Sequence, residues 1–208
     1  MNQITEPKAT SPQDALDLLS AGKPIRNAQI NDMLNLDPLV MSRWLCGEDM
    51  RGIYLPIILC SCSLNGLNAE GRTFYEMFEL TGCHISEARF NQAYFYSILL
   101  IEECIFEKEF DGKHIQSDGR VVIHNTVFTH WADFSHISWR GKVDLVGVSF
   151  PGGTNLLQVL NEQPQIRFER EIRISGCGFR REDVPPELRR RGLGIVPLAQ
   201  SNPRHPKG

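Results

Sequence analysis

The chain has 208 residues, of which 41% are hydrophobic and 23% are charged, and its formal net charge is −3. This composition is typical of a globular protein and excludes wholesale disorder. The longest apolar run, residues 53–60, is far shorter than the roughly 18 residues that a membrane-spanning helix requires. No basic segment followed by an apolar core opens the chain, so we expect a cytoplasmic protein without a membrane partner.

The N-terminal segment carries two helix signals. Ser11 can cap a helix, Pro12 suits the first helical position and Asp14 favours the positive end, so a helix is predicted from about residue 12 to 21. Pro38 and the apolar residues that follow it predict a second helix between Pro38 and Cys46. We therefore interpret residues 1–52 as a helical cap and lead.

The middle of the chain has a five-residue apolar period that fits neither a helix nor a strand. The positions that carry it are Leu80, Ile85, Phe90, Phe95, Leu100, Ile105, Phe110 and Ile115. Such a period suits a chain that bends once in each unit and sends one bulky side chain inward. Four units would form a coil of about 20 residues, and successive coils would stack by pairing their backbones. The predicted stacked pairs are Leu80 on Leu100, Ile85 on Ile105, Phe90 on Phe110 and Phe95 on Ile115.

Small residues precede many bulky positions by two, as in Cys83/Ile85, Ala88/Phe90 and Ala93/Phe95. Further units begin at Ala132 and Val143, and an early one spans residues 27–31. These units resemble the pentapeptide-repeat family, whose units read roughly Ala-Asp/Asn-Leu-x-x. The resemblance implies a mainly β fold, a right-handed quadrilateral β-helix, which we place at residues 53–163.

Departures from the repeat keep another parallel β-helix open as the alternative fold. The small position is filled by larger residues at Ile98, Glu103, Lys108 and Lys113. After Phe128 the spacing of bulky residues alternates between six and five.

The C-terminal part changes pattern. Apolar and charged residues alternate over residues 165–175, which predicts an edge strand or hairpin, and we interpret residues 164–192 as a cap on the last coil. Short helical segments are expected at residues 155–160 and 184–188. The Gly- and Pro-rich residues 193–208 are expected to be a disordered tail.

The six cysteines show no zinc-ligand spacing. We expect buried, reduced thiols, with Cys62 and Cys83 protected from labelling. No metal or cofactor is assigned.

The densest polar cluster spans His130 to His136 and includes Asp133. Such residues can perform acid–base chemistry or hold a metal, which makes an enzyme using this region one hypothesis. The repeat instead places them on a flat, solvated side that lacks a pocket, so we assign no catalytic residue and expect no enzyme. Single substitutions of His130, Asp133 or His136 are expected to change stability by less than about 0.5 kcal/mol.

Two weaker signals lie near the C-terminus. The glycines of residues 149–154 precede a short helix, where a phosphate can bind, but the segment lacks the Gly-Lys-Ser/Thr of a phosphate loop. The basic run at residues 189–191 lacks interleaved aromatic residues, so a nucleic-acid partner is not expected.

Charge divides the chain into an acidic body and a basic tail. Residues 167–208 hold ten basic and five acidic residues, a net +5, whereas the first 166 residues hold twelve and twenty, a net −8. Reversing Glu102, Glu107 and Asp111 together should therefore weaken binding to a basic partner.

A non-catalytic protein-binding module that uses its solenoid surface is the function we expect, with an unidentified protein as partner. One alternative is a structural or assembly protein, which would polymerise or cap a complex, and a homodimer through a solenoid end belongs to this class. Another is a DNA mimic that binds topoisomerases, as some members of the family resembled do.

Overall fold

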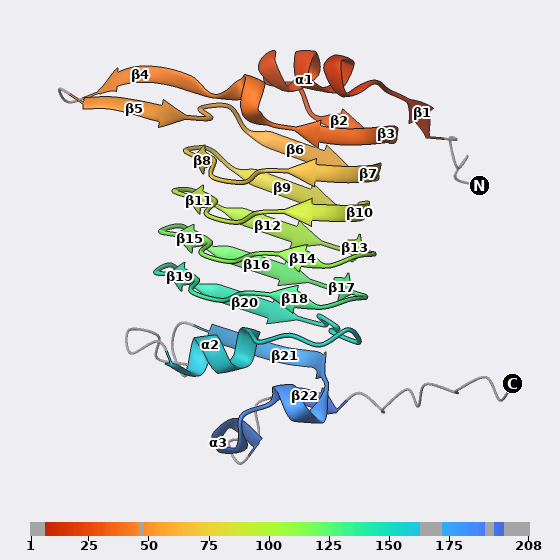
Figure 1. The fold of residues 1–208 in the computed structure, drawn as a ribbon, viewed down its shortest axis with the longest axis vertical. Coiled ribbons are helices and arrows are strands. Elements are labelled where there is room, and N and C mark those ends of the chain that lie inside the picture. The colour runs from red at the N-terminus through yellow and green to blue at the C-terminus, as the bar shows by residue number, and fades with distance from the viewer. Residues whose placement is uncertain (1–6, 46–47, 163–171, 190–193, 198–208) are drawn as a thin grey trace, which may run out of the picture.

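The computed structural model describes residues 7–45, 48–162, 172–189 and 194–197. Over these residues the chain winds into a β-solenoid of about six turns, whose strands pair in parallel with those of the next turn (Figure 1). The predicted mainly β fold with stacked parallel coils is confirmed. Its right-handed, four-sided form stays a prediction.

Three parallel sheets form the sides of the solenoid. The first contains β1 (Lys8–Ala9), β3 (Ala28–Asn35), β7 (Ser63–Asn68), β10 (His84–Arg89), β13 (Ile105–Phe106), β14 (Phe110–Asp111), β17 (Val127–Phe128) and β18 (Ala132–Asp133). The second contains β2 (Ile25–Arg26), β6 (Ile57–Cys60), β9 (Phe78–Thr81), β12 (Leu99–Glu102), β16 (Val121–His124), β20 (Val143–Val146), β21 (Ile172–Phe179) and β22 (Gly194–Pro197). The third contains β8 (Thr73–Phe74), β11 (Tyr94–Phe95), β15 (Gln116–Ser117) and β19 (Ser138–Trp139).

One regular turn contains 21 or 22 residues, not the 20 predicted. Leu99 pairs with Phe78 in the preceding turn and with Val121 in the following one. Of the four predicted stacked pairs, Phe90 and Phe110 form a ring contact, with centroids 5.4 Å apart. Leu80 instead lies beside Ile101, Ile85 beside Phe106 and Phe95 beside Ser117.

The five-residue frame is therefore wrong at two positions. Leu100 is half-buried and Ile105 is 41% exposed, whereas Ile101 and Phe106 point into the core. The reason is local: side chains alternate between the two faces of each strand, so the residue next to an inward Leu99 must face outward.

A column of aromatic rings fills the interior. The six phenylalanines predicted to lie inside are all buried, and they are Phe90, Phe95, Phe110, Phe128, Phe134 and Phe150. Rings from successive turns stack almost in parallel, as Phe106, Phe128 and Phe150 do at centroid distances of 4.8 and 5.0 Å. Such contacts add to the stabilisation from burial itself.

Each turn bends sharply at a residue in the left-handed backbone region. At one corner these residues are Asn27, Ser61, Gly82, Glu103, Asn125, Gly147 and Gly176. The next residue in every turn is small or β-branched and buried, so the chain can bend inward without a clash.

Three consecutive turns place a cysteine at this corner, namely Cys62, Cys83 and Cys104. Each thiol lies 3.3–3.6 Å from a main-chain carbonyl of the preceding turn. A hydrogen bond with the Cys104 thiol, reinforced by burial, raises the pKa of Cys83 to about 12. The five cysteines within the described ranges are free thiols; four are buried, as expected, whereas Cys60 is half-buried, and Cys46 lies outside those ranges.

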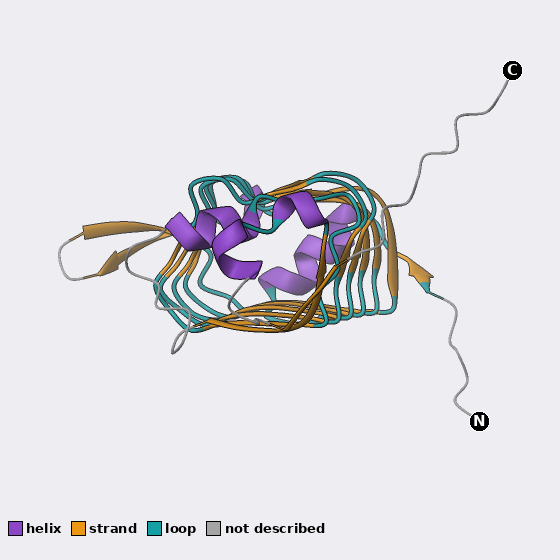
Figure 2. Ribbon diagram, turned by 90° about the horizontal axis from the view of Figure 1, so that it is seen from below, coloured by secondary structure: helices purple, strands orange, loops and turns teal. Residues whose placement is uncertain are grey.

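The first turn is covered by α1 (Pro12–Ser20), which confirms the first predicted helix. The Ser11 hydroxyl accepts a hydrogen bond from the Asp14 backbone N–H at 3.1 Å. The apolar face of α1 buries Ala15, Leu16 and Leu19 in the core of the solenoid. Figure 2, a view along the stack, shows helices lying within the outline of the coils.

The predicted second helix between Pro38 and Cys46 is wrong. Only a single 3₁₀ turn, η1 (Asp37–Leu39), forms there, with Pro38 in its first turn. The chain then enters β4 (Met41–Leu45), which pairs antiparallel with β5 (Glu48–Gly52) as a hairpin. The proline signal was correct for a helical start, but the hairpin satisfies the backbone beyond Leu39.

The C-terminal strand is not the edge strand or hairpin predicted. Strand β21 lies between β20 and β22 and pairs in parallel with both, so the coils continue past residue 163. Residues 163–171 lie outside the described ranges, as do residue 193 and residues 198–208 of the expected tail. Within that tail, residues 194–197 form β22 rather than disordered chain.

The short C-terminal helices are present where they were expected. They are α2 (Leu156–Glu162) and α3 (Pro186–Arg189), and the 3₁₀ turn η2 (Arg181–Asp183) precedes α3. The solenoid strands therefore run from β1 to β22, further in both directions than residues 53–163.

Truncation of Phe90 should destabilise the protein, whereas truncation of Ile105 should not. Phe90 is 1% exposed and contacts Phe78, Phe95 and Phe110, so Phe90→Ala should lower the free energy of unfolding by about 3–5 kcal/mol. Ile105→Ala should change it by less than about 0.5 kcal/mol. Denaturant unfolding of both variants tests this difference, and equal losses would contradict the 21–22-residue register.

Candidate functional site

The His130–His136 cluster does not assemble into a catalytic group. His130 is exposed, and its ring nitrogen contacts the Glu107 carbonyl oxygen and the Thr129 hydroxyl. His136 is exposed and stacks on His114 in the preceding turn, with centroids 4.7 Å apart. Within the described residues, no hydrogen bond or ion pair joins Asp133 to either His130 or His136.

Asp133 instead holds neighbouring turns together. Its carboxylate accepts hydrogen bonds from the Ser135 hydroxyl at 2.5 Å, the Ser135 backbone N–H at 2.9 Å and the Asn155 side chain at 2.9 Å. Burial alone would raise the pKa of Asp133, but these hydrogen bonds and Lys113 together lower it below its ordinary value. Asn155 also accepts a hydrogen bond from the Phe134 backbone N–H, a role that no local sequence pattern indicates.

Two backbone N–H groups at the start of α2, next to the glycine-rich segment, already donate hydrogen bonds to oxygen atoms of the protein itself. The Thr154 hydroxyl accepts from the Leu156 backbone N–H at 3.1 Å, and the Asp183 carboxylate accepts from the Thr154 backbone N–H at 3.1 Å. A carboxylate at this position would repel a phosphate, which argues against the phosphate hypothesis. The Arg189 side chain and residues 190–191 of the basic run lie outside what is described.

Many carboxylates of the acidic body lie beside a basic residue. The ion pairs join Arg72 to Asp37, Arg89 to Glu87, Lys113 to Asp111 and Asp133, Arg120 to Asp144, and Arg140 to Asp118. Of the acids chosen for charge reversal, Glu107 also binds His84 at 2.7 Å, and Glu102 and Asp111 are half-buried. This alternation of charge differs from the dense, aligned carboxylates that a DNA mimic needs.

Three tyrosines from successive turns form an outward-facing stack, which we call the tyrosine ladder (Tyr54, Tyr75 and Tyr96). The rings of Tyr54 and Tyr75 have centroids 4.4 Å apart and planes 2° apart, and those of Tyr75 and Tyr96 are 4.8 Å and 10° apart. Exposure increases along the ladder, from 8% at Tyr54 to 42% at Tyr96. Burial, with a hydrogen bond to Tyr54, raises the pKa of Tyr75 to about 12, so the hydroxyl stays protonated at neutral pH.

Charged groups border the tyrosine ladder at both ends. The Arg43 guanidinium lies 4.4 Å from the centroid of the Tyr54 ring, a cation–π contact. At the other end, Tyr94 packs against Tyr96 at 4.6 Å and donates its hydroxyl to Asp118 at 2.7 Å. Asp118 in turn binds Arg140 at 3.2 Å.

The β4–β5 hairpin projects beyond the side of the solenoid that carries the ladder (Figures 1 and 2). In Figure 1 it lies above the edge formed by β8, β11, β15 and β19. Gly52 of β5 is required here, because a Cβ atom at this position would lie only 2.6 Å from the Tyr75 ring. Met41 pairs with Gly52 and is 39% exposed, and it shares a strand face with Arg43.

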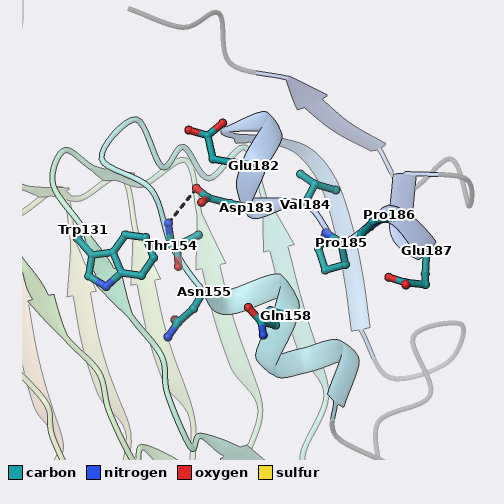
Figure 3. A pocket seen from close by; sticks show the side chains of 10 residues that line it. All are labelled: Trp131, Thr154, Asn155, Gln158, Glu182, Asp183, Val184, Pro185, Pro186 and Glu187. Carbon is teal, nitrogen blue, oxygen red and sulfur yellow. Dashed lines mark hydrogen bonds between the residues drawn. The ribbon is translucent and has the colours of Figure 1, made fainter. Parts of the chain in front are cut away.

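A cleft of about 560 Å³ lies near the C-terminal end of the stack (Figure 3). Its walls come from three segments: Trp131, residues 154–158 and residues 182–187. Asp183 is half-buried in it, and burial raises the pKa of its carboxyl group, although the Thr154 backbone N–H and Arg180 act in the opposite direction. The sequence did not indicate this cleft, because its walls come from positions more than 50 residues apart.

No family model, curated protein or solved structure matches the chain. Among the described residues, no group of three or more His, Cys, Asp or Glu side chains is placed to hold a metal ion. The described helices include none that is long and apolar enough to cross a membrane.

Removal of the Asp133 carboxylate should destabilise the fold, contrary to the expectation from the repeat alone. Asp133→Ala removes the acceptor of the Ser135 hydroxyl and of one of the two hydrogen bonds that the Asn155 amide donates, which should lower the free energy of unfolding by about 1–2 kcal/mol at pH 7. His130→Ala, the exposed control, should change it by less than about 0.5 kcal/mol.

The loss in Asp133→Ala should also depend on pH. Because the folded-state pKa of Asp133 is lowered, its stabilising effect is fully present above the unfolded pKa of about 3.9 and disappears as the pH falls through the folded value. Urea unfolding of wild type and variant between pH 7 and pH 2 measures this. A stability difference that persists unchanged at pH 2 would contradict the assignment.

Proposed function

We propose that the protein is a non-catalytic protein-binding module of the pentapeptide-repeat type, acting in the cytoplasm through the side of its solenoid. The observation that carries the proposal is the tyrosine ladder beside the β4–β5 hairpin, which is exposed at its Tyr96 end. Tyrosine is enriched at the centres of protein interfaces, because its ring buries a large apolar area and its hydroxyl can still find a partner.

Rigidity makes this surface suited to binding. Each ring of the ladder is held by a ring or a guanidinium group of the next turn or the hairpin, so little side-chain entropy remains to be lost on association. Exposed apolar side chains adjoin the ladder, with Met41 in β4 and the 38% exposed Ile98 two residues after Tyr96. The ion pair of Asp118 and Arg140 supplies a polar border, a common arrangement in interfaces.

The other hypotheses have less support. An enzyme using residues 130–136 would need Asp133 to orient a histidine, but Asp133 is engaged by Ser135 and Asn155. End-to-end polymerisation would need both ends of the solenoid to be open, and α1 covers the first turn, so a homodimer through an open solenoid end would have to use the C-terminal end. Topoisomerase binding by DNA mimicry, and nucleic-acid binding, both fit poorly with the mixed charges along the sides.

Truncation of the exposed end of the ladder should weaken partner binding strongly without unfolding the protein. We expect Tyr96→Ala/Ile98→Ala to recover at least about tenfold less of each specific partner in affinity capture followed by mass spectrometry, because a central tyrosine can contribute about 2 kcal/mol or more. Thermal unfolding should remain cooperative in this variant.

Ile105→Ala is the matched control, because Ile105 is an equally exposed apolar residue in a different sheet. It should retain every partner. Partners that are lost equally in both variants, or kept by both, would contradict the proposal. Concentration-dependent self-association that survives in the ladder variant would instead favour the assembly hypothesis.

A further inference from the structure

The C-terminal cleft has a chemical character unlike that of the tyrosine ladder. Its lining includes the carboxylates of Glu182, Asp183 and Glu187, and no lysine, arginine or histidine is among the described residues that line it. Arg180, whose charge acts on the Asp183 carboxylate, donates its Nε to the Pro151 carbonyl oxygen at 2.8 Å. The cleft is therefore a concave surface with an excess of negative charge.

An aromatic wall lies close to one of these carboxylates. Trp131 is 40% exposed, and Figure 3 shows its indole on the side of the cleft opposite α3. A Cβ atom placed on Gly153 would lie 3.2 Å from the Asp183 carboxylate and 3.2 Å from the Trp131 ring. The Asp183 carboxylate and the six-membered ring of the Trp131 indole are thus near neighbours, and Gly153 places no side chain between them.

We propose that this cleft binds an alkylammonium group, such as the side chain of a lysine. A cation over the face of an indole, within about 6 Å of the ring centroid, is attracted by the π electrons, and tryptophan is the strongest aromatic partner for such a cation. The same cation gains Coulomb energy from Asp183, whose half-buried carboxylate is less screened by water than the exposed Glu182 and Glu187. Polar side chains of Asn155 and Gln158 complete the lining.

The cleft is independent of the proposed protein-binding surface. The tyrosine ladder belongs to the turns that contain residues 54–96, whereas the cleft is built from residue 131 onward. Two sources can supply the same chemical group: a lysine side chain in a peptide, or a small free amine. A peptide gains further contacts along the open cleft, so the two sources should differ in affinity.

Titration of the intact protein with defined amines tests the proposal. The probes are butylammonium, the peptide Gly-Gly-Lys-Gly-Gly with blocked ends, and the same peptide with glutamate in place of lysine. Binding is followed through the backbone N–H signals of the protein in NMR spectra, which every variant at position 131 retains. We expect saturable binding of both cationic probes and none of the glutamate peptide, with an affinity that decreases as salt increases. Tighter binding of the lysine peptide identifies a peptide as the source, and equal affinity identifies a small amine.

Variants assign the binding to the cleft. Trp131→Leu and Glu182→Gln/Asp183→Asn should each weaken binding of the lysine peptide at least fivefold, whereas Trp131→Phe, which keeps an aromatic face, should lose less than Trp131→Leu. Glu70→Gln removes one exposed carboxylate from a distant turn and should leave the affinity within twofold. Unchanged spectra of every variant in the absence of probe, apart from local shifts, establish that the fold is intact.

The proposal is overturned if the wild-type protein binds neither cationic probe, or if Trp131→Leu binds the lysine peptide as well as wild type does. Equal binding of the glutamate and lysine peptides would also overturn it. Because Tyr96→Ala/Ile98→Ala leaves the cleft unchanged, that variant should bind the lysine peptide normally, so this test and the test of the tyrosine ladder can fail independently.

Discussion

In-register backbone pairing of each turn with the next determines which side chains lie above one another along the solenoid. Every regular turn places a residue beside its counterpart 21 or 22 positions away. When successive turns carry the same type of residue at that position, the side chains form a column along the solenoid. Inside, this gives the stacked rings of Phe106, Phe128 and Phe150, and at a corner it gives the buried Cys62, Cys83 and Cys104. The backbone hydrogen bonds fix the register, and the aromatic column fills the space that remains.

Both candidate binding surfaces follow from this regularity and from its interruptions. The tyrosine ladder is an outward column of the same kind as the phenylalanine column, and the β4–β5 hairpin, inserted within one turn, extends beside it. The cleft lies where the regular repeat is interrupted. Strands β20 and β21 pair residues that are 29 positions apart in the sequence, because α2 and the segment before β21 lie between them. Both proposed binding surfaces thus lie where an inserted segment makes the otherwise flat side of the solenoid project or become concave.

The sequence predicted the inward phenylalanines, α1 and the buried thiols, because bulky and small residues recur locally at fixed spacing. It did not predict the length of a turn, because several corners use Ser61, Glu103 or His114 in the left-handed region, where glycine would have marked a bend. Pro38 predicts a helical start, but the chain beyond it forms the β4–β5 hairpin and not a helix. The role of Asn155 and the cleft depend on contacts across turns, which no local pattern in one sequence reveals.

Deletion of a whole turn tests the register most directly. Removing residues 99–120 joins Ile98 to Val121, which occupies the same place in its turn as Leu99, and should leave a shorter solenoid that unfolds cooperatively on heating. Removing only residues 99–109, half as many residues, joins Ile98 to Phe110. A residue of the first sheet then stands where a strand of the second sheet should begin. Cooperative unfolding should therefore be lost. Thermal unfolding followed by circular dichroism measures both. A half-turn deletion that unfolds as cooperatively as the whole-turn deletion would contradict the stacked-turn account.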